Sequence, residues 1–447
     1  MRADLIQHLN GKNILFASVP AEGHVNPMTG LAKFLQGMGC NVRWYTSEIF
    51  SQKLERLGIH HYPFVKALDL NQENLLEKLP ERVTIHDPAA KLDFDLINFF
   101  GNRSEEYYRD LQDIYASFPF DLLVADSMFS AIPFVRHRMH IPVVSIGIIP
   151  LAEDSYDLAP YGMALPPATN ATERSEYAAL RDMATDVLFK RSIDNYDAIL
   201  TKHGIPHQNS VMFDLLIRES LIYLQIGIPS FEYERSDLSD NIRFVGALLP
   251  HADPRQGPSW HDDRLLKYEK IVLVTQGTVE KDIQKILIPT LEAFKGTDVL
   301  VIATTGGSNT EKLREKFPFE NFIIEDYIPF DDVMPYADVY VTNGGYSGTL
   351  LSIKHNLPII AAGVHEGKNE VCARIGHFKI GVNLRTEVPF PSAIRSAVNK
   401  ILGDSSYKTN ITALAEEIRS YNANEISAGY ISELLQVRRK TSTPVEP

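Results

Sequence analysis

The segment EDYIPFDDVMPYADVYVTNGGYSGTLLSIKHNLPII, residues 325–360, contains two short apolar runs separated by a glycine turn and a helical pattern. The first run, Val339 to Thr342, predicts a buried strand, and the second, which begins at Pro358, predicts another. Between them, Asn343-Gly344-Gly345 predicts a tight turn, and a helix is expected from Tyr346. A strand, a helix and a strand in this order predict a parallel sheet covered by helices.

The same alternation continues on both sides of this segment. The apolar runs that predict further strands are 14–19, 42–46, 59–64, 122–125, 143–148, 221–226 and 242–245 in the first half of the chain, and 271–275, 299–303 and 322–325 in the second half. Residues 251–258, HADPRQGP, lie between the two series and predict a linker because they contain proline and glycine. We therefore expect two wound α/β domains, residues 1–250 and 251–447.

The composition excludes several classes of protein. The chain has 447 residues, of which 44% are hydrophobic and 23% charged, as in ordinary soluble globular proteins. Its formal net charge of −13 argues against a nucleic-acid binder, which needs clustered lysine and arginine. The two cysteines lie far apart in sequence and support neither a disulfide framework nor a zinc site. The chain has no run of 18 apolar residues and no signal-peptide pattern, so we expect a cytoplasmic protein without stable membrane insertion.

Turns that follow strands are the first places to search for chemistry, because ligands of wound sheets bind outside the carboxyl ends of the strands. His24 follows the first strand, in a loop that we expect to precede a helix capped by Asn26, with Pro27 in its first position. Asp126 follows the strand at 122–125. A histidine takes a proton near neutral pH when a carboxylate holds its tautomer, so the pair could act as a base and its orienting partner. Spacing alone equally allows His24 to pack the turn and Asp126 to cap the next helix.

Two turns in the second half predict an anion site. Asn343-Gly344-Gly345 precedes a helix, and its glycines let backbone N–H groups approach a phosphate at the positive end of the helix dipole. Gln276-Gly277-Thr278 follows the first strand of the second half and offers a hydroxyl and further N–H groups. A diphosphate suits such a site. The alternative is that both segments are only tight turns between a strand and a helix.

Together these motifs resemble the family-1 glycosyltransferases, the UDP-glycosyltransferase-like enzymes of GT-B architecture, in which two Rossmann-like wound domains face each other. The resemblance covers about residues 12–438. It is strongest in residues 325–360, which are similar to the nucleotide-sugar signature of that family, and weaker in GHVNP (23–27) and VADSMFSAIPF (124–134). It implies that residues 1–250 bind the acceptor and 251–447 the donor, with helices at about 411–437 forming a strap that packs back on the first domain.

The resemblance also implies roles for individual residues. His24 corresponds to the catalytic base, and Asp126 to the carboxylate that orients it. Tyr327 corresponds to an aromatic residue that stacks on the donor base, whose edge meets backbone atoms of Ile328. The other positions that it implies in donor binding are Gly277, Thr278, Asn343, Gly344, Gly345, Ser347, Glu366 and Lys368. Of these, Glu366 and Lys368 lie in Glu366-Gly367-Lys368-Asn369, where the family usually has an acid and a glutamine that bind the sugar hydroxyls.

Three positions depart from the family pattern. Asn343 stands where the family most often has a histidine, and an amide donates a hydrogen bond without a positive charge. Leu351 stands where many members have a glutamate that binds the ribose hydroxyls, a contact that a deoxyribose donor would miss least. Phe330 replaces a common glutamine. The donor is therefore left open between UDP- and dTDP-sugars.

The expected activity is metal-independent transfer of a hexose, with inversion, to a hydroxyl of a small, largely apolar acceptor such as a natural product. No cofactor is expected besides the nucleotide-sugar co-substrate. An apolar acceptor needs aromatic walls, and the candidates are Phe94, Phe99, Phe129, Tyr156 and Tyr161. Ordinary core packing is an equal alternative for each of them. Two other functions stay open: a membrane-surface transferase of a lipid-linked sugar, and a catalytically silent homologue that acts as a partner protein.

Overall fold

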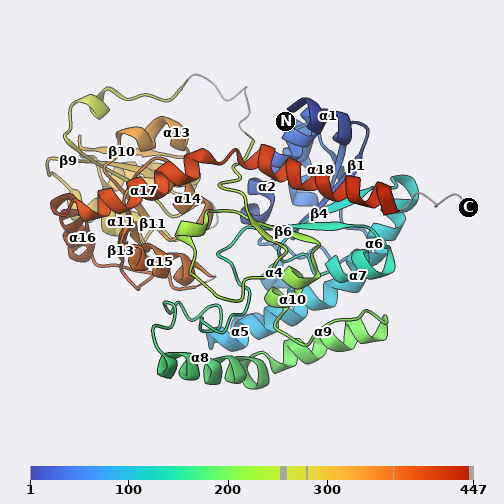
Figure 1. The fold of residues 1–447 in the computed structure, drawn as a ribbon. Coiled ribbons are helices and arrows are strands. Elements are labelled where there is room, and N and C mark those ends of the chain that lie inside the picture. The colour runs from blue at the N-terminus through green and yellow to red at the C-terminus, as the bar shows by residue number, and fades with distance from the viewer. Residues whose placement is uncertain (1, 252–258, 278–279, 366, 442–447) are drawn as a thin grey trace, which may run out of the picture.

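A computed structural model describes residues 2–251, 259–277, 280–365 and 367–441, which form two parallel sheets covered by helices (Figure 1). The first sheet has the strand order β3-β2-β1-β4-β5-β6-β7, and the second has the order β10-β9-β8-β11-β12-β13. Neighbouring strands pair in parallel in both sheets. Two Rossmann-like domains are therefore present, as the alternating pattern predicts.

The first domain contains seven strands among the described residues. They are β1 (Asn13–Ala17), β2 (Asn41–Tyr45), β3 (His60–Tyr62), β4 (Leu122–Asp126), β5 (Val143–Gly147), β6 (Ile222–Gln225) and β7 (Ile242–Phe244). Its α-helices are α1 (Arg2–Leu9), α2 (Glu22–Gly37), α3 (Ser51–Arg56), α4 (Leu75–Lys78), α5 (Pro88–Asp95), α6 (Ser104–Ser117), α7 (Ile132–Arg138), α8 (Ala171–Met183), α9 (Lys190–Lys202) and α10 (Met212–Glu219). The central strands are buried on both faces, which explains why they appear as continuous apolar runs in the sequence.

The second domain repeats this plan. Its strands are β8 (Lys270–Thr275), β9 (Val299–Thr304), β10 (Phe322–Glu325), β11 (Val339–Thr342), β12 (Ile359–Ala361) and β13 (Gly381–Asn383). Its helices are α11 (Leu287–Phe294), α12 (Thr310–Lys316), α13 (Phe330–Val333), α14 (Tyr346–Lys354), α15 (Lys368–His377), α16 (Pro391–Gly403) and α17 (Ser406–Ser420), and the last helix of the chain is α18 (Ala423–Thr441). The two sheets lie on either side of the expected domain boundary at residues 250 and 251.

Each sheet has one point at which the strand order reverses. In the first sheet this point lies between β1 and β4, and in the second it lies between β8 and β11. Ligands of open α/β sheets bind at the carboxyl ends of the strands at such a reversal. At the carboxyl ends of these four strands lie His24 in the first turn of α2, Asp126 as the last residue of β4, and Gly277 and Asn343 in the turns after β8 and β11. The topology therefore brings the sequence candidates together in two pairs, one in each domain.

Helix α2 starts earlier than the sequence pattern predicts. The prediction that Asn26 caps it is wrong, because the helix begins at Glu22 and Pro27 lies inside it. The Asn26 side chain instead accepts a hydrogen bond from Lys53 Nζ at 2.8 Å. His24 consequently lies in the first turn of the helix rather than in a loop before it, and a helical backbone fixes the direction of its side chain more tightly.

The C-terminal strap is formed by one helix rather than by the whole of residues 411–437. Helix α17 packs on α14 and stays in the second domain, whereas α18 crosses to the first domain and packs on α1 and α2 (Figure 1). The predicted linker begins at His251, whose backbone N–H donates to Thr29 Oγ1 at 2.9 Å, and its remainder, 252–258, lies outside the described residues. In the part of the chain that the structure describes, no helix has the length and apolar character needed to cross a membrane.

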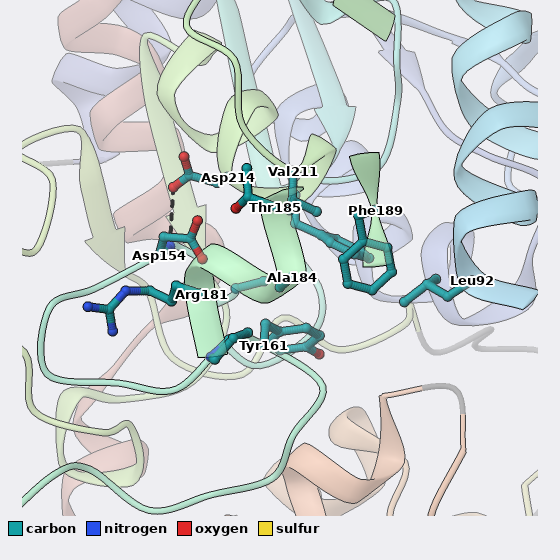
Figure 2. Close-up of a pocket in the computed structure, with 12 residues that line it drawn as sticks. Leu92, Asp154, Tyr161, Arg181, Ala184, Thr185, Phe189, Val211 and Asp214 are labelled. Carbon is teal, nitrogen blue, oxygen red and sulfur yellow. Dashed lines mark hydrogen bonds between the residues drawn. The ribbon is translucent and has the colours of Figure 1, made fainter. Parts of the chain in front are cut away.

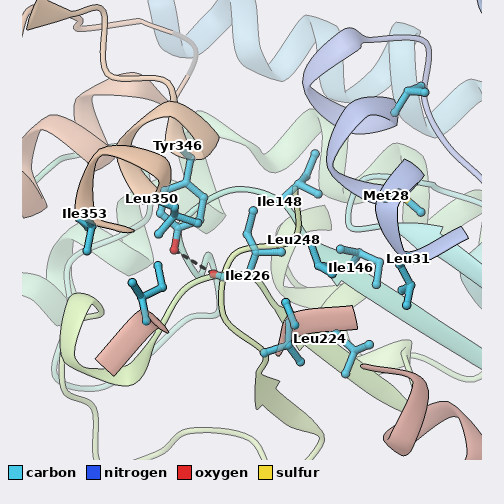
Figure 3. Packing of buried hydrophobic residues seen from close by; sticks show 14 of the residues in the cluster. Met28, Leu31, Ile146, Ile148, Leu224, Ile226, Leu248, Tyr346, Leu350 and Ile353 are labelled. Atoms are coloured by element: carbon cyan, nitrogen blue, oxygen red, sulfur yellow. Dashed lines mark hydrogen bonds between the residues drawn. The ribbon is translucent and has the colours of Figure 1, made fainter. Parts of the chain in front are cut away.

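The domains also meet where α14 contacts the end of β6. The hydroxyl of Tyr346, the first residue of α14, donates to the carbonyl of Ile226 at 3.0 Å, within a cluster of apolar side chains from both domains (Figure 3). Gly227 beside it has a φ of +105°, and a Cβ there would lie 2.6 Å from the Tyr346 hydroxyl oxygen. Only glycine fits this position, on grounds of both strain and space. The helix that follows the Asn343-Gly344-Gly345 turn is thus seated directly on the first domain.

Candidate active site

His24 and Asp126 form a hydrogen-bonded pair at the reversal point of the first sheet. His24 Nδ1 lies 2.9 Å from Asp126 Oδ1, although 102 positions separate the two residues in sequence. The Asp126 side chain is fully buried, and that of His24 is 20% exposed. The alternative that Asp126 caps the next helix does not hold, because α7 begins only at Ile132.

The Asp126 carboxylate is fixed by two further donors. Oδ2 accepts the backbone N–H of Val19 at 2.6 Å, and Oδ1 accepts that of Met128 at 2.8 Å. These bonds compensate for the burial of the carboxylate and stabilise its charged form. A carboxylate accepts hydrogen bonds only, so His24 Nδ1 carries the hydrogen of this bond, and in the neutral ring Nε2 then presents a lone pair. Among the described residues nothing hydrogen-bonds Nε2, and the pair therefore has the geometry of a general base and its orienting partner.

The glycine turn before α14 lies at the reversal point of the second sheet. Gly344 has a φ of +83°, and a Cβ there would lie 2.5 Å from Cys372 Sγ. Gly345 precedes the first residue of α14, and among the described residues no side chain caps this helix. Its first N–H groups, which include that of the half-buried Ser347, have no partner within the helix. An anion such as a diphosphate would accept hydrogen bonds from these N–H groups.

The turn after β8 lies beside this helix terminus. Asn343 Nδ2 donates to the carbonyl of Gln276 at 2.6 Å, which ties the two turns together. Gly277 has a φ of +77°, a conformation that favours glycine. The side-chain oxygen of Gln276 is buried and has no hydrogen-bond donor among the described residues. Thr278, which the family resemblance places at the diphosphate, lies outside the described residues.

Tyr327 is exposed, whereas the neighbouring Ile328 is buried. The Tyr327 side chain is 65% exposed, and its hydroxyl donates to the carbonyl of Gly306 at 2.7 Å. A Cβ on Gly307 would lie 3.1 Å from the same hydroxyl, so the glycines allow the ring to approach the turn after β9. An exposed, anchored aromatic face can stack on a nucleotide base.

The segment between β12 and α15 is held by groups that the sequence analysis did not identify. Glu387 Oε1 accepts the backbone N–H groups of Val364 at 2.7 Å and His365 at 3.2 Å. Lys285 pairs with Glu387 and Glu280; burial opposes its charge, but the hydrogen bonds to the two carboxylates raise the pKa of Lys285. No motif marks these three residues, and Glu387 lies 102 positions from Lys285 in sequence. Their contacts hold the backbone of residues 364 and 365.

Two sugar-side residues named from the sequence lie in or next to this segment. Lys368 begins α15, and its Cβ lies 3.7 Å from the position of a Cβ on Gly344, so its side chain starts beside the glycine turn. A lysine there can approach a phosphate group as a point charge. Glu366 lies outside the described residues.

Two of the three residues that depart from the family pattern, Leu351 and Phe330, make apolar contacts in the structure. Leu351 is partly buried and packs on the apolar core, so it supplies no polar group to a ribose. Phe330 makes an edge contact with Tyr340, with ring centroids 6.2 Å apart. Neither side chain replaces the hydrogen bonds that the usual glutamate and glutamine would make.

The proposed acceptor residues separate into different environments. Tyr161 lines a small cavity of about 20 Å³ between the β5–α8 loop and helices of the first domain (Figure 2). Tyr156 is 74% exposed and lines a different, larger groove of about 850 Å³. Phe129 is fully buried, stacks on Tyr107 and belongs to the core. Phe94 and Phe99 are partly buried, and Phe99 packs against the core cluster of the first domain.

The cavity that Tyr161 lines combines apolar walls with charged groups. Leu92, Phe189, Val211 and Phe213 contribute apolar surface, and Asp154, Arg181 and Asp214 contribute charge (Figure 2). Burial, and then the neighbouring Asp214, raise the pKa of Asp154 to about 6. The cavity has room for about one water molecule, so an acceptor that enters it has to displace lining side chains.

Comparison with known proteins gives one consistent result. The model of the UDP-glucoronosyl and UDP-glucosyl transferase family matches residues 178–419. The 4'-demethylrebeccamycin synthase of Lentzea aerocolonigenes is 32% identical over 92% of this chain and 97% of its own length, and UDP-glucosyltransferase 1 of Beauveria bassiana is 28% identical over 93% of each chain. The crystal structure of the calicheamicin glycosyltransferase CalG4 matches the fold with a TM-score of 0.72 at 20% identity, over 98% of this chain and 100% of that one.

These matches cover both domains, and they agree with the GT-B arrangement of two parallel-sheet domains. The chain therefore belongs to the UDP-glucoronosyl and UDP-glucosyl transferase family and is a glycosyltransferase.

Proposed function

We propose that this enzyme transfers a hexose from a UDP- or dTDP-sugar to a hydroxyl of a small, largely apolar acceptor such as a natural product, with inversion and without a metal ion. The hydrogen bond between His24 and the buried Asp126 is the observation that carries this proposal. It provides a base at one sheet reversal, while the uncapped terminus of α14 provides an anion site at the other. The names of relatives that act on rebeccamycin-type and calicheamicin-type compounds support a natural product as the acceptor.

The proposed reaction is a single displacement. His24 Nε2 takes the proton of the acceptor hydroxyl, and the oxygen attacks the anomeric carbon of the sugar. The bond between that carbon and the diphosphate oxygen breaks, and the nucleoside diphosphate leaves with the electron pair. Asp126 stabilises the imidazolium that forms, while the N–H groups of the turns around Gly277 and Gly344 stabilise the charge of the leaving group. Attack from the face opposite the leaving group inverts the anomeric configuration.

Donor recognition in this proposal uses both backbone groups and side chains. Tyr327 stacks on the base, Ile328 backbone atoms meet its edge, and Lys368 approaches the diphosphate. Thr278, Ser347 and Glu366 complete the set that the family resemblance assigns. Leu351 offers no carboxylate to the ribose hydroxyls. The proposal therefore keeps both dTDP- and UDP-sugars as donors, and the assay compares them directly.

A transfer assay tests the proposal. Purified protein is incubated with UDP-glucose or dTDP-glucose and a panel of flat aromatic phenols and alcohols, with and without EDTA, and products are identified by mass spectrometry and proton NMR. We expect a β-glycoside from an α-linked donor, formed at the same rate in EDTA. Retention of configuration, or loss of activity in EDTA, would contradict the mechanism.

Transfer to these acceptors, together with co-sedimentation with liposomes and donor hydrolysis, separates the two other functions. A transferase of lipid-linked sugars would co-sediment with anionic liposomes and use only lipid acceptors, whereas a silent homologue would neither transfer the sugar nor hydrolyse the donor. Either result would overturn the proposed function.

A further inference from the structure

The β5–α8 loop, residues 148–170, contains both Tyr156 and Tyr161 and lines the cavity of Figure 2. Two of its residues have a positive φ: Gly162 at +102°, which glycine readily adopts, and Ala164 at +56°, which is uncommon for a residue with a Cβ. A non-glycine residue in the left-handed region costs roughly 1–2 kcal/mol. Something outside the loop therefore has to hold this conformation.

The group that holds it belongs to the other domain. Glu370, in the first turn of α15, accepts the backbone N–H of Gly162 at 2.7 Å and that of Ala164 at 2.8 Å, both through Oε1. The neighbouring Asn369 side chain donates to the carbonyl of Gly162. Three hydrogen bonds from the donor domain thus fix the turn next to Tyr161 in the first domain.

Arg374 extends this contact to the start of the loop. Its Nη1 pairs with Glu370 Oε2 at 2.9 Å, and its Nε donates to Glu232 Oε1 of the first domain at 3.0 Å. Glu232 Oε2 in turn accepts the backbone N–H of Leu151 at 3.1 Å. The Arg374 guanidinium therefore pairs with both carboxylates that hold the loop: Glu232 near its beginning and Glu370 near its middle.

This cluster is almost entirely removed from water. The side chains of Arg374, Glu232 and Glu370 are between 2% and 6% exposed, and the guanidinium lies 4.2 Å from the centre of the Tyr233 ring. Burial alone would lower the pKa of Arg374, but Glu232 and Glu370 raise it. A buried ion cluster contributes little net stability compared with apolar packing, but removal of one member strongly destabilises the protein, because a buried charge is left unpaired. Arg235, whose side chain is 2% exposed, adds a second guanidinium 3.5 Å from Glu232 Oε1.

The loop is also placed against the sugar side of the donor site. A Cβ on Gly367 would lie 3.2 Å from the hydroxyl oxygen of Tyr161, so this hydroxyl approaches the residue just before α15. Glu370 lies three residues further along the chain. The same short segment therefore borders the donor-sugar region and anchors the wall of the acceptor pocket.

We propose that Glu370 of the donor domain is a positioning residue for the acceptor: by accepting the N–H groups of Gly162 and Ala164, it fixes the β5–α8 loop and so sets which acceptors fit. This proposal rests on the proposed function, because it assigns that loop to the acceptor. Glu370 does not contact the reacting atoms. Its effect is expected on acceptor binding and acceptor choice, with little effect on donor binding.

The test compares Glu370→Ala, Glu370→Gln and the control Glu173→Ala. Glu173 also accepts a backbone N–H of this loop, that of Thr169, but from α8 of the same domain. Losing two hydrogen bonds to a charged group predicts an increase of about tenfold or more in acceptor KM for Glu370→Ala. The amide oxygen of Glu370→Gln still accepts both N–H groups, so its acceptor KM should rise less. The acceptor KM of Glu173→Ala should stay within about twofold of the wild type. In the Glu370 variants, the affinity for the nucleoside diphosphate and the rate of donor hydrolysis should also stay within about twofold.

Hydrogen exchange gives a readout that does not need turnover. The amides of Gly162 and Ala164 should exchange faster in Asn369→Ala and Glu370→Gln than in the wild type, and this measurement remains available if Glu370→Ala fails to fold. Unchanged exchange in both variants, or an acceptor KM that stays within twofold in folded Glu370→Ala, would overturn the positioning role. If the wild type glycosylates none of the acceptors, the proposed function itself fails, and that outcome differs from any of these.

Discussion

The two sheet reversals hold their chemistry in different ways. In the first domain, two side chains, His24 and Asp126, make the site, and the carboxylate is satisfied by backbone N–H groups. In the second domain the site is mainly backbone: glycines at 277 and 344 with positive φ, and the first N–H groups of α14. Removing a side chain should therefore damage the first site, whereas adding a side chain should damage the second. The first change should affect turnover and the second donor binding.

The largest effect is expected for His24→Ala. Loss of a positioned base costs about 10²–10⁴-fold in kcat, whereas the affinity for the nucleoside diphosphate should barely change because the other domain binds it. Steady-state kinetics and calorimetric titration of the diphosphate check both statements. A variant that is less stable but turns over normally would show that His24 only packs the turn.

Asp126→Asn should cause an equal or smaller loss of turnover. The base is still present, but an amide cannot accept from His24 Nδ1 and from the N–H groups of Val19 and Met128 as the carboxylate does. Because Asp126 is fully buried, the melting temperature should fall as well. Measuring kcat at saturating donor and acceptor in a folded sample separates the two consequences, and a larger loss than in His24→Ala would contradict the assigned order.

A smaller effect, on donor binding alone, is expected for Gly344→Ala. The new Cβ would lie 2.5 Å from Cys372 Sγ at a φ of +83°, so the turn must shift. If the turn relaxes in the free variant, restoring it on binding costs about 1–2 kcal/mol and lowers the affinity for the nucleoside diphosphate by about tenfold. Gly403→Ala is the matched control, because a Cβ there meets no atom within 4 Å. Equal affinities in the two variants would argue against the backbone site.

The smallest effect on turnover is expected for Asp154→Asn, which should instead change the pH dependence of stability. The pKa of Asp154 is about 6 in the folded protein and 3.8 ordinarily, so folding favours the neutral carboxyl. Wild-type stability is fully present below about pH 4 and is partly lost as the pH rises through 6. The variant should therefore melt at a higher temperature than the wild type at pH 8, and at a similar temperature at pH 3.5. A lower melting temperature at pH 8 would contradict this sign.

Much of the fold could be predicted from the sequence, because buried parallel strands such as β4 and β11 are continuous apolar runs bounded by turns. Helix boundaries were harder. Asn26 and Pro27 form a typical helix start, yet α2 begins at Glu22, since tertiary contacts outweigh a local capping preference. The strap prediction was correct for α18 and wrong for α17, because apolar spacing shows that a helix packs but does not identify its partner.

The site could be predicted only where one short segment carries the signal. His24 and the Asn343-Gly344-Gly345 turn each follow a strand and Asp126 ends one, so topology alone brings them to a sheet edge. Lys285, Glu387 and Glu370 act through contacts between distant parts of the chain, and nothing in their neighbouring sequence marks them. The aromatic acceptor candidates had no positional signal, and Phe129 proved to be a core residue.

The most direct test of the account is a double-mutant cycle on His24 and Asp126, measured as kcat for transfer to one good hydroxyl acceptor. If Asp126 acts only by orienting His24, the double variant His24→Ala with Asp126→Asn should be no slower than His24→Ala alone, because residues that act as a unit are not additive. If the two losses multiply, the residues act independently, and the base and its orienting partner proposed at the first sheet reversal would be contradicted.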